Sequence, residues 1–290
     1  MACRQADKLQ WSGFYQLQED FRMLPINSVV CGNCVDIMSD WHDGVIDLTV
    51  TSPPYDNLRD YKGYGFDFQS IAGQLYRVTK PGGVVVWIVG DATIKGSETG
   101  TSFRQALYFK DIGFNLFDTM IYAKRGFANP STTRYHQVFE YCFVLSKSKP
   151  KTFNPIKDRK NICTRRGGDA VRQKDGTIKK GNRGGMPLAE YGQRWNIWEY
   201  QIGGGNISAD RLVHKHPAAF PEQLAADHII SWSNENDIVL DPMCGSGTTC
   251  KMAKQLDRNY IGIEISEEYS QLSRERILLT EEAKELKIGN

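Results

Sequence analysis

The chain of 290 residues is long enough to bury a sizeable core, and we expect one α/β domain that carries an insertion. Its 40% hydrophobic and 24% charged residues are typical of a soluble globular protein, and its longest apolar runs are too short to cross a membrane. The first residues lack the apolar core of an export signal, so we expect a cytoplasmic protein. Its seven scattered cysteines fit a reducing compartment.

Apolar strands alternate with helical patterns along most of the chain. Strands are predicted near 28–32, 45–51, 83–89, 116–124, 138–146, 238–240 and 260–263. Helices are predicted near 34–41, 68–79, 102–112, 221–232, 250–256 and 267–286, and a Lys-Pro-Gly-Gly turn at 80–83. The alternation predicts an α/β fold with a doubly wound, mainly parallel sheet. The loop between 124 and 138 has no helical pattern, so the strands on either side of it are predicted to form an antiparallel hairpin at the sheet edge.

A polar and aromatic motif, TSPPY at residues 51–55, ends the second predicted strand. Proline has no N–H to donate to a sheet, so the chain must leave the sheet at this motif. The motif presents a hydroxyl, backbone carbonyls and a ring at the carboxyl end of a strand, where open α/β sheets bind ligands. A planar base with an amino group suits such a turn, because the oxygens can accept from the NH₂ group while the ring stacks on the base.

A glycine motif, DPMCGSGTT at residues 241–249, follows the strand at 238–240. Its glycines allow a tight turn and a close approach of the backbone to a ligand. Glu264 ends the next strand, 19 positions after Gly245, where a carboxylate can accept from both hydroxyls of a ribose. These features predict a nucleotide-like ligand. They also fit a nicotinamide oxidoreductase, although the third glycine of that fingerprint is absent.

The segment from Lys147 to Arg194 is strongly basic. It holds 14 Lys and Arg against four Asp and Glu, a net charge of +10, whereas the whole chain carries +2. Over residues 148–210, aromatic residues such as Tyr191, Trp195 and Trp198 lie among the basic ones, and no sustained periodicity is visible. The segment predicts a surface that binds nucleic-acid phosphates, with a solvated loop as the alternative.

Taken together, these motifs and their order resemble the β-class of DNA amino-methyltransferases, which use S-adenosylmethionine. The resemblance covers most of residues 27–147 and 213–275, and also includes the turn at 80–83 and the element HPAAFP at 216–221. It implies a methyltransferase (Rossmann-like) sheet with an inserted basic target-recognition region. The expected divisions are a lead-in (1–26), a catalytic half (27–147), the insertion (148–212) and a cofactor-binding half (213–290).

The resemblance also implies roles for individual residues. The catalytic turn is expected to consist of Ser52, Pro53, Pro54 and Tyr55. The cofactor is expected to contact Asn33, Thr51, Phe220, Asp241, Pro242, Cys244, Gly245, Ser246, Gly247, Thr248, Thr249 and Glu264. DNA contacts are expected from Arg165, Arg166, Lys179, Lys180, Arg183 and Arg194. Asn33 departs from the family pattern, which has an acid there to accept from the adenine amino group of the cofactor; an amide oxygen can still accept that bond.

The implied reaction is methyl transfer to the exocyclic amine of a base. Such an amine is a poor nucleophile, and the Ser52 hydroxyl and the Pro53 carbonyl are expected to accept from its N–H groups and free its lone pair. The base must leave the duplex to reach this turn, and Tyr55 is expected to stack on it. Four aromatic residues after the motif could close over the flipped base or pack in the core: Tyr61, Tyr64, Phe66 and Phe68.

Several alternatives stay open at this point. Serine at position 52 is more frequent in the cytosine-N4 members of the resembling family, so cytosine N4 is favoured and adenine N6 is the alternative. The expected partner is double-stranded DNA, and a homodimer is expected from the family only. A catalytically inactive DNA-binding or cofactor-binding protein and an RNA or protein substrate are further alternatives. No metal is expected, because the CGNC sequence at 31–34 has no second cysteine pair with ligand spacing.

Overall fold

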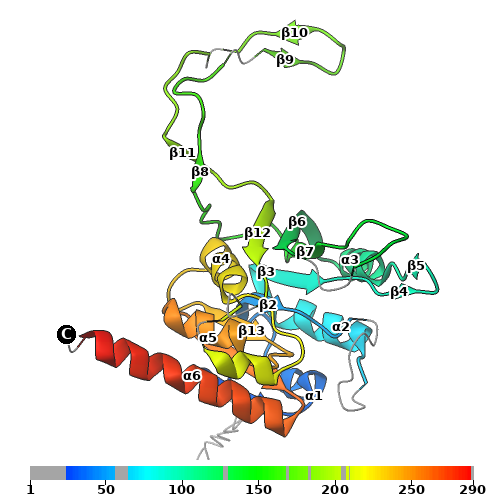
Figure 1. Cartoon of the computed structure of the whole chain (residues 1–290), viewed down its shortest axis with the longest axis vertical. Coiled ribbons are helices and arrows are strands. Elements are labelled where there is room, and N and C mark those ends of the chain that lie inside the picture. The colour runs from blue at the N-terminus through cyan, green and yellow to red at the C-terminus, as the bar shows by residue number, and fades with distance from the viewer. Residues whose placement is uncertain are drawn as a thin grey trace, which may run out of the picture.

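The computed structural model describes residues 24–55, 65–126, 130–167, 170–181, 184–203, 207–208 and 210–288. Their centre is an eight-stranded sheet in the order β1-β14-β13-β2-β3-β7-β6-β12 (Figure 1). The strands are β1 (Ser28–Cys31), β2 (Ile46–Thr51), β3 (Thr79–Val89), β6 (Asn115–Arg125), β7 (Phe139–Ser146), β12 (Ile197–Gln201), β13 (Ile238–Asp241) and β14 (Asn259–Glu264). Only the pairs β3–β7 and β6–β7 are antiparallel, so the mainly parallel sheet with an antiparallel hairpin is confirmed.

Helices cover both faces of the sheet. One face packs against α1 (Cys34–Ser39), α2 (Phe68–Val78) and α3 (Thr101–Asp111). The other face packs against α4 (Glu222–Trp232), α5 (Thr248–Gln255) and α6 (Glu267–Ile288). Along β3, Val84 and Val86 contribute to one core and Val85 and Trp87 to the other, as expected for a strand that is buried on both sides. The structure is therefore the predicted doubly wound α/β fold. Within the described ranges, no helix is long and apolar enough to cross a bilayer.

The predicted turn at 80–83 is instead a large bulge inside β3. Ile46 of β2 pairs with Thr79, but Leu48 already pairs with Val84, so the residues between them loop out of the ladder. Gly82 has a φ of +82°, which favours glycine. The strand therefore begins at Thr79, four residues earlier than the turn signal predicts.

The antiparallel hairpin does not lie at the sheet edge, which corrects that part of the prediction. β12 pairs in parallel with β6 and is itself the edge strand, although its residues fall in the segment without periodicity. Trp198 and Tyr200 point into the core while Glu199 between them is exposed. This alternation is typical of a half-buried strand, and the surrounding basic residues obscured it.

The described residues of 159–167, 170–181 and 184–192 form a long arm that stands away from the rest of the molecule (Figure 1). It is built from two short antiparallel ladders. β8 (Arg159–Lys160) pairs with β11 (Tyr191–Gly192), and β9 (Val171–Arg172) pairs with β10 (Ile178–Lys179). Nearly all of its described side chains are exposed, so backbone pairing rather than a core holds its shape. The boundaries of the target-recognition insertion remain a prediction.

Candidate active site

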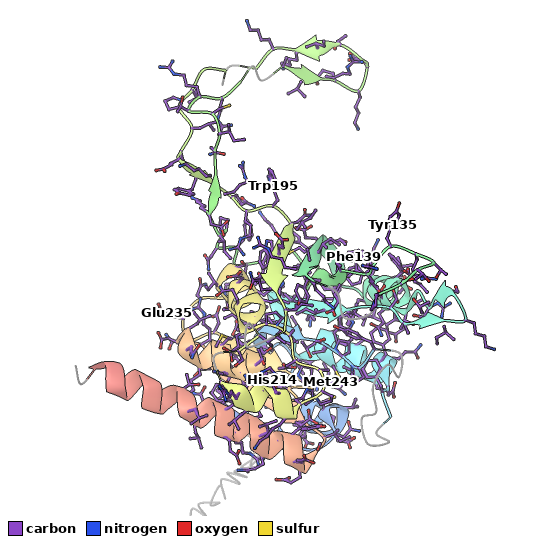
Figure 2. All side chains as sticks on the ribbon, viewed as in Figure 1. Tyr135, Phe139, Trp195, His214, Glu235 and Met243 are labelled. Atoms are coloured by element: carbon purple, nitrogen blue, oxygen red, sulfur yellow. The ribbon has the colours of Figure 1, made fainter. Side chains whose placement is uncertain are left out.

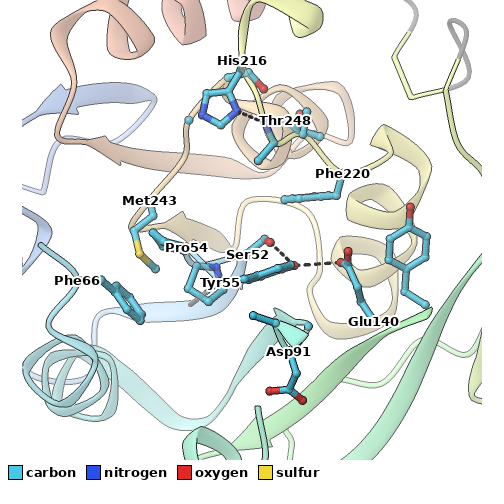
Figure 3. A pocket seen from close by; sticks show the side chains of 18 of the residues that line it. Ser52, Pro54, Tyr55, Phe66, Asp91, Glu140, His216, Phe220, Met243 and Thr248 are labelled. Atoms are coloured by element: carbon cyan, nitrogen blue, oxygen red, sulfur yellow. Dashed lines mark hydrogen bonds between the residues drawn. The ribbon is translucent and has the colours of Figure 1, made fainter. Parts of the chain in front are cut away.

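A cleft of about 1180 Å³ opens at the carboxyl ends of the parallel strands β1, β2, β13 and β14 (Figure 3). Residues 52–55 and 242–246 both line it, although nearly 190 positions separate them in the sequence. This edge of an open α/β sheet is where ligands bind. The structure therefore brings the TSPPY motif and the glycine motif into one site.

The glycine motif forms a tight loop between β13 and α5. Gly245 has a φ of +50° and Gly247 a φ of +77°. A Cβ on Gly247 would lie 2.1 Å from the Ser273 hydroxyl, and one on Gly245 would lie 2.7 Å from His216 Nε2. Both positions therefore require glycine for conformation and for space.

Glu264 holds this loop from the end of β14. Its Oε2 accepts from the Gly245 N–H at 2.8 Å and its Oε1 accepts from the Ser266 N–H at 3.0 Å. Burial raises the pKa of Glu264, while these backbone hydrogen bonds oppose the shift. Glu264 also lines the cleft, where its carboxylate would face a bound ligand.

Four predicted cofactor residues brace the site from behind and are absent from the cleft lining: Thr51, Asp241, Gly247 and Thr249. The Thr51 hydroxyl donates to Asp241 at 2.7 Å, and Thr249 donates to the Val50 carbonyl at 3.0 Å. Burial raises the pKa of Asp241 to about 6. These bonds fasten the end of β2 to the residues that flank the glycine loop, so Thr51, Asp241 and Thr249 position the two motifs relative to each other.

A buried ion cluster, which the motifs did not reveal, supports the glycine loop. Arg276 of α6 is fully buried and donates to the Ser246 carbonyl and to the Thr248 hydroxyl. It also pairs with Asp210 at 3.0 Å and with Glu222 at 2.9 Å. Although burial raises the pKa of Asp210, hydrogen bonds from Arg276 and Lys251 hold it well below its usual range. The one signal in the sequence is an arginine on the apolar face of a helix.

The catalytic turn is held by a chain of polar contacts (Figure 3). Ser52 Oγ lies 2.7 Å from Tyr55 Oη, and Tyr55 Oη donates to Glu140 Oε2 at 3.0 Å and to the Ile88 carbonyl at 3.2 Å. Lys124 pairs with the other carboxylate oxygen of Glu140. Burial and the Glu140 charge raise the pKa of Tyr55 well above its ordinary value, so this phenol stays protonated. Glu140 was not predicted from the sequence. Its only signal there is that it is the one acidic residue in the mainly apolar strand β7.

At the end of β1, Asn33 lines the cleft and also caps α1. Its side-chain oxygen accepts from the Val35 N–H at 2.8 Å, which is the usual role of asparagine before a helix. Burial raises the pKa of the neighbouring Cys34 to about 11, so this thiol is protonated at neutral pH.

The aromatic candidates after the motif fall in different places. Phe68 packs edge-on against Phe109 and Tyr108 in the core, which settles it as a core residue, whereas Phe66 lines the cleft. Tyr61 and Tyr64 lie outside the described residues.

At the cleft mouth lies a further aromatic residue that sequence reasoning missed. Tyr135 lines the mouth and is 99% exposed; Figure 2 shows it on the loop before β7. Arg134 anchors this loop by donating to the Gly96 carbonyl at 2.7 Å. A ring as exposed as this one has no packing role among the residues that the structure describes.

The predicted DNA contacts are also divided. Arg165, Arg166, Lys179 and Lys180 are exposed on the arm. Arg194 pairs with Asp158 and with the buried Asp227, the latter at 2.6 Å, so two carboxylates compete with DNA for it and its DNA contact stays a prediction. Arg183 lies outside the described residues.

Comparisons with known proteins identify the family of this chain. The family model N6_N4_Mtase, described as DNA methylase, matches residues 46–275. The orphan methyltransferase M.BamHII of Bacillus amyloliquefaciens is 56% identical over 238 residues, which cover 81% of this chain and 89% of that protein. The type II methyltransferase M.BglII of Bacillus subtilis is 28% identical over 256 residues, covering 84% of this chain and 67% of that protein.

Two solved structures have the same fold. PvuII DNA methyltransferase (cytosine-N4-specific) matches with a TM-score of 0.62 and 22% identity, covering 86% of this chain and 85% of that one. TTHA0409 from Thermus thermophilus, complexed with S-adenosyl-L-methionine, matches with a TM-score of 0.59 and 21% identity, covering 87% and 93%. At these identities the likeness supports the fold, while the family model and M.BamHII show the family. The chain therefore belongs to the N6/N4 DNA methylase family, and the expected enzyme class, an S-adenosylmethionine-dependent DNA amino-methyltransferase, is confirmed.

Proposed function

We propose that this protein methylates cytosine N4 in double-stranded DNA, on a base flipped out of the duplex. One observation carries the proposal: the Ser52 hydroxyl and the glycine loop line the same cleft. A cleft that holds a nucleotide-binding loop and an acceptor for an amino group side by side suits group transfer between two bound molecules.

The glycine-loop side of the cleft fits S-adenosylmethionine. The Glu264 carboxylate lines the cleft and would accept from the ribose hydroxyls, and Gly245, which also lines it, leaves room for close backbone approach. Phe220 and Asn33 line the same side, and would pack on the cofactor and accept from its adenine amino group. When bound, S-adenosylmethionine supplies an electrophilic methyl group.

The opposite side of the cleft fits an exocyclic amine. The Ser52 hydroxyl and the Pro53 carbonyl would accept from its two N–H groups, which draws the nitrogen toward a tetrahedral shape and frees its lone pair. The ring of Tyr55 lies beside these acceptors and would stack on the base. Most of the rate enhancement would then come from holding the amine in line with the methyl group.

Support for cytosine rests on serine at position 52; adenine N6 is the alternative because a hydroxyl accepts from either amine. Nucleoside mass spectrometry of DNA treated with the enzyme and S-adenosylmethionine distinguishes the two. We expect N4-methylcytosine. N6-methyladenine instead would keep the site and its chemistry but would show that Ser52 does not select the base.

Replacement of Tyr135 by alanine is expected to lower turnover on duplex DNA about tenfold, because its ring would fill the gap that the flipped base leaves and so offset lost stacking. A target base placed in a mismatch is already loosened, so the same variant should lose little activity on that substrate. Tyr135→Phe keeps the ring and should resemble the wild type on both. An equal drop on paired and mismatched targets would place Tyr135 in another role.

Neutralising Arg165 and Arg166 to glutamine is expected to weaken DNA binding and to flatten its salt dependence by about one slope unit for each phosphate that the protein no longer binds. Both residues are exposed on the arm, which stands clear of the sheet. The matched variant with lysine at both positions keeps the charges and should keep the slope. Binding titrations at several salt concentrations measure this, and an unchanged slope in the glutamine variant would place the phosphate surface elsewhere.

A homodimer remains part of this proposal through the resemblance alone, and a cytoplasmic location through the composition of the sequence. Sedimentation of the protein with and without DNA measures the first.

A further inference from the structure

The hydrogen bonds around Tyr55 determine which way the Ser52 proton points. Tyr55 has a single phenolic proton, and two of its three polar neighbours, the Glu140 carboxylate and the Ile88 carbonyl, can only accept. The phenolic proton of Tyr55 therefore points toward Glu140 and Ile88 and is not available to Ser52. The remaining contact, 2.7 Å between Tyr55 Oη and Ser52 Oγ, must then be donated by the serine.

This direction matters for the amine that Ser52 faces. A serine hydroxyl has one proton and two lone pairs, so a proton given to Tyr55 leaves both lone pairs on the cleft side. The reverse direction would place a proton where the N–H groups of the amine must donate. It would therefore oppose the acceptor role that the proposed reaction requires.

Glu140 is the strongest acceptor on Tyr55 and is itself held in place. Lys124 binds its other carboxylate oxygen, and both side chains are largely buried, with exposed fractions of 25% for Lys124 and 16% for Glu140. A charged acceptor forms a stronger hydrogen bond than a neutral carbonyl, and the Ile88 carbonyl is the more distant of the two. The Lys124–Glu140 pair lies on neighbouring strands, β6 and β7, so the sheet itself fixes the acceptor.

We propose that Glu140 is a positioning residue for methyl transfer, which acts through Tyr55 to keep the Ser52 hydroxyl oriented as an acceptor. The inference rests on the proposed role of Ser52. It assigns no contact between Glu140 and the base: its effect passes along Glu140, Tyr55 and Ser52 (Figure 3). Glutamine at 140 retains an acceptor oxygen, whereas leucine retains none.

The test is a double-mutant cycle between positions 140 and 55, read as the single-turnover rate of methyl transfer at saturating S-adenosylmethionine and DNA. Glu140→Leu and Tyr55→Phe are each expected to lower the rate about tenfold, the worth of one oriented hydrogen bond. If Glu140 acts through the phenol, Glu140→Leu should have no further effect in the Tyr55→Phe background. Glu140→Gln should retain most of the wild-type rate.

Three measurements separate this role from a structural one. The cofactor affinity and the melting temperature of Glu140→Leu should stay near the wild-type values. The matched control is Glu235→Leu, which changes an exposed glutamate on the turn after α4, and its rate should also stay near wild type. If Glu140→Leu melts early because Lys124 is left unpaired, the double variant Lys124→Met/Glu140→Leu replaces it in the cycle.

The two levels of the proposal fail in different ways. An inactive wild-type enzyme would contradict the proposed function itself. An active wild type with an unaffected Glu140→Leu, or effects at positions 140 and 55 that multiply in the double variant, would overturn only the role of Glu140.

Discussion

Ser52→Ala is expected to lower methyl transfer to DNA about 100-fold or more while S-adenosylmethionine binds with nearly unchanged affinity. The hydroxyl is one of two acceptors proposed for the target amine, and the Pro53 carbonyl alone would leave one N–H without a partner. The cofactor contacts proposed here lie on the glycine loop and at Glu264, Phe220 and Asn33, which the substitution leaves intact.

Single-turnover rates and calorimetric titration with S-adenosylmethionine measure the two quantities separately. Ser39→Ala is a suitable control, since Ser39 is an exposed serine at the end of α1, and it should change neither. Equal losses of rate and of cofactor affinity would contradict Ser52 as an acceptor for the amine, because they would show that the residue supports the whole site.

Arg276→Leu is expected to destabilise the fold by about 3–5 kcal/mol, because it removes one of the two cations, Arg276 and Lys251, that pair with both Asp210 and Glu222 in this buried cluster. In a chain of this size that corresponds to a drop of about 10 °C in melting temperature. The Ser246 carbonyl would also lose its donor, so cofactor affinity should fall with stability.

Arg104→Leu provides the matched comparison. Arg104 is exposed on α3, and its replacement should change the unfolding free energy by less than about 0.5 kcal/mol. Thermal or denaturant unfolding of both variants measures the difference. A small effect for Arg276→Leu would mean that the glycine loop is held by Glu264 and its own turn geometry without the ion cluster.

The sequence predicted those features that depend on neighbouring residues. Two prolines after an apolar strand place the TSPPY turn at a strand end, and Gly245 with Gly247 specify a tight loop, because each constraint acts over a few residues. The alternation of strands and helices was likewise sufficient to predict the doubly wound sheet, since strands and amphipathic helices differ in the spacing of their apolar residues along the sequence.

The features that were missed depend on contacts between distant parts of the chain. Glu140 and Arg276 become significant only when β7 and α6 reach the cleft, and nothing next to them in sequence indicates their partners. Asp241 stays a predicted cofactor contact, and nothing in its motif indicated the hydrogen bond that it accepts from Thr51, 190 residues away. Arg194 looked like a DNA contact because its segment is basic, whereas in the folded chain it pairs with Asp227 of α4.

The most direct test of the account is a structure of the protein with a target DNA duplex and S-adenosylhomocysteine. We expect the target base to lie outside the helix, with its amino nitrogen within hydrogen-bond distance of Ser52 Oγ and of the Pro53 carbonyl, and the ribose of the cofactor on Glu264. A base that remains stacked in the duplex, or an amino group bound away from Ser52, would contradict the proposed site.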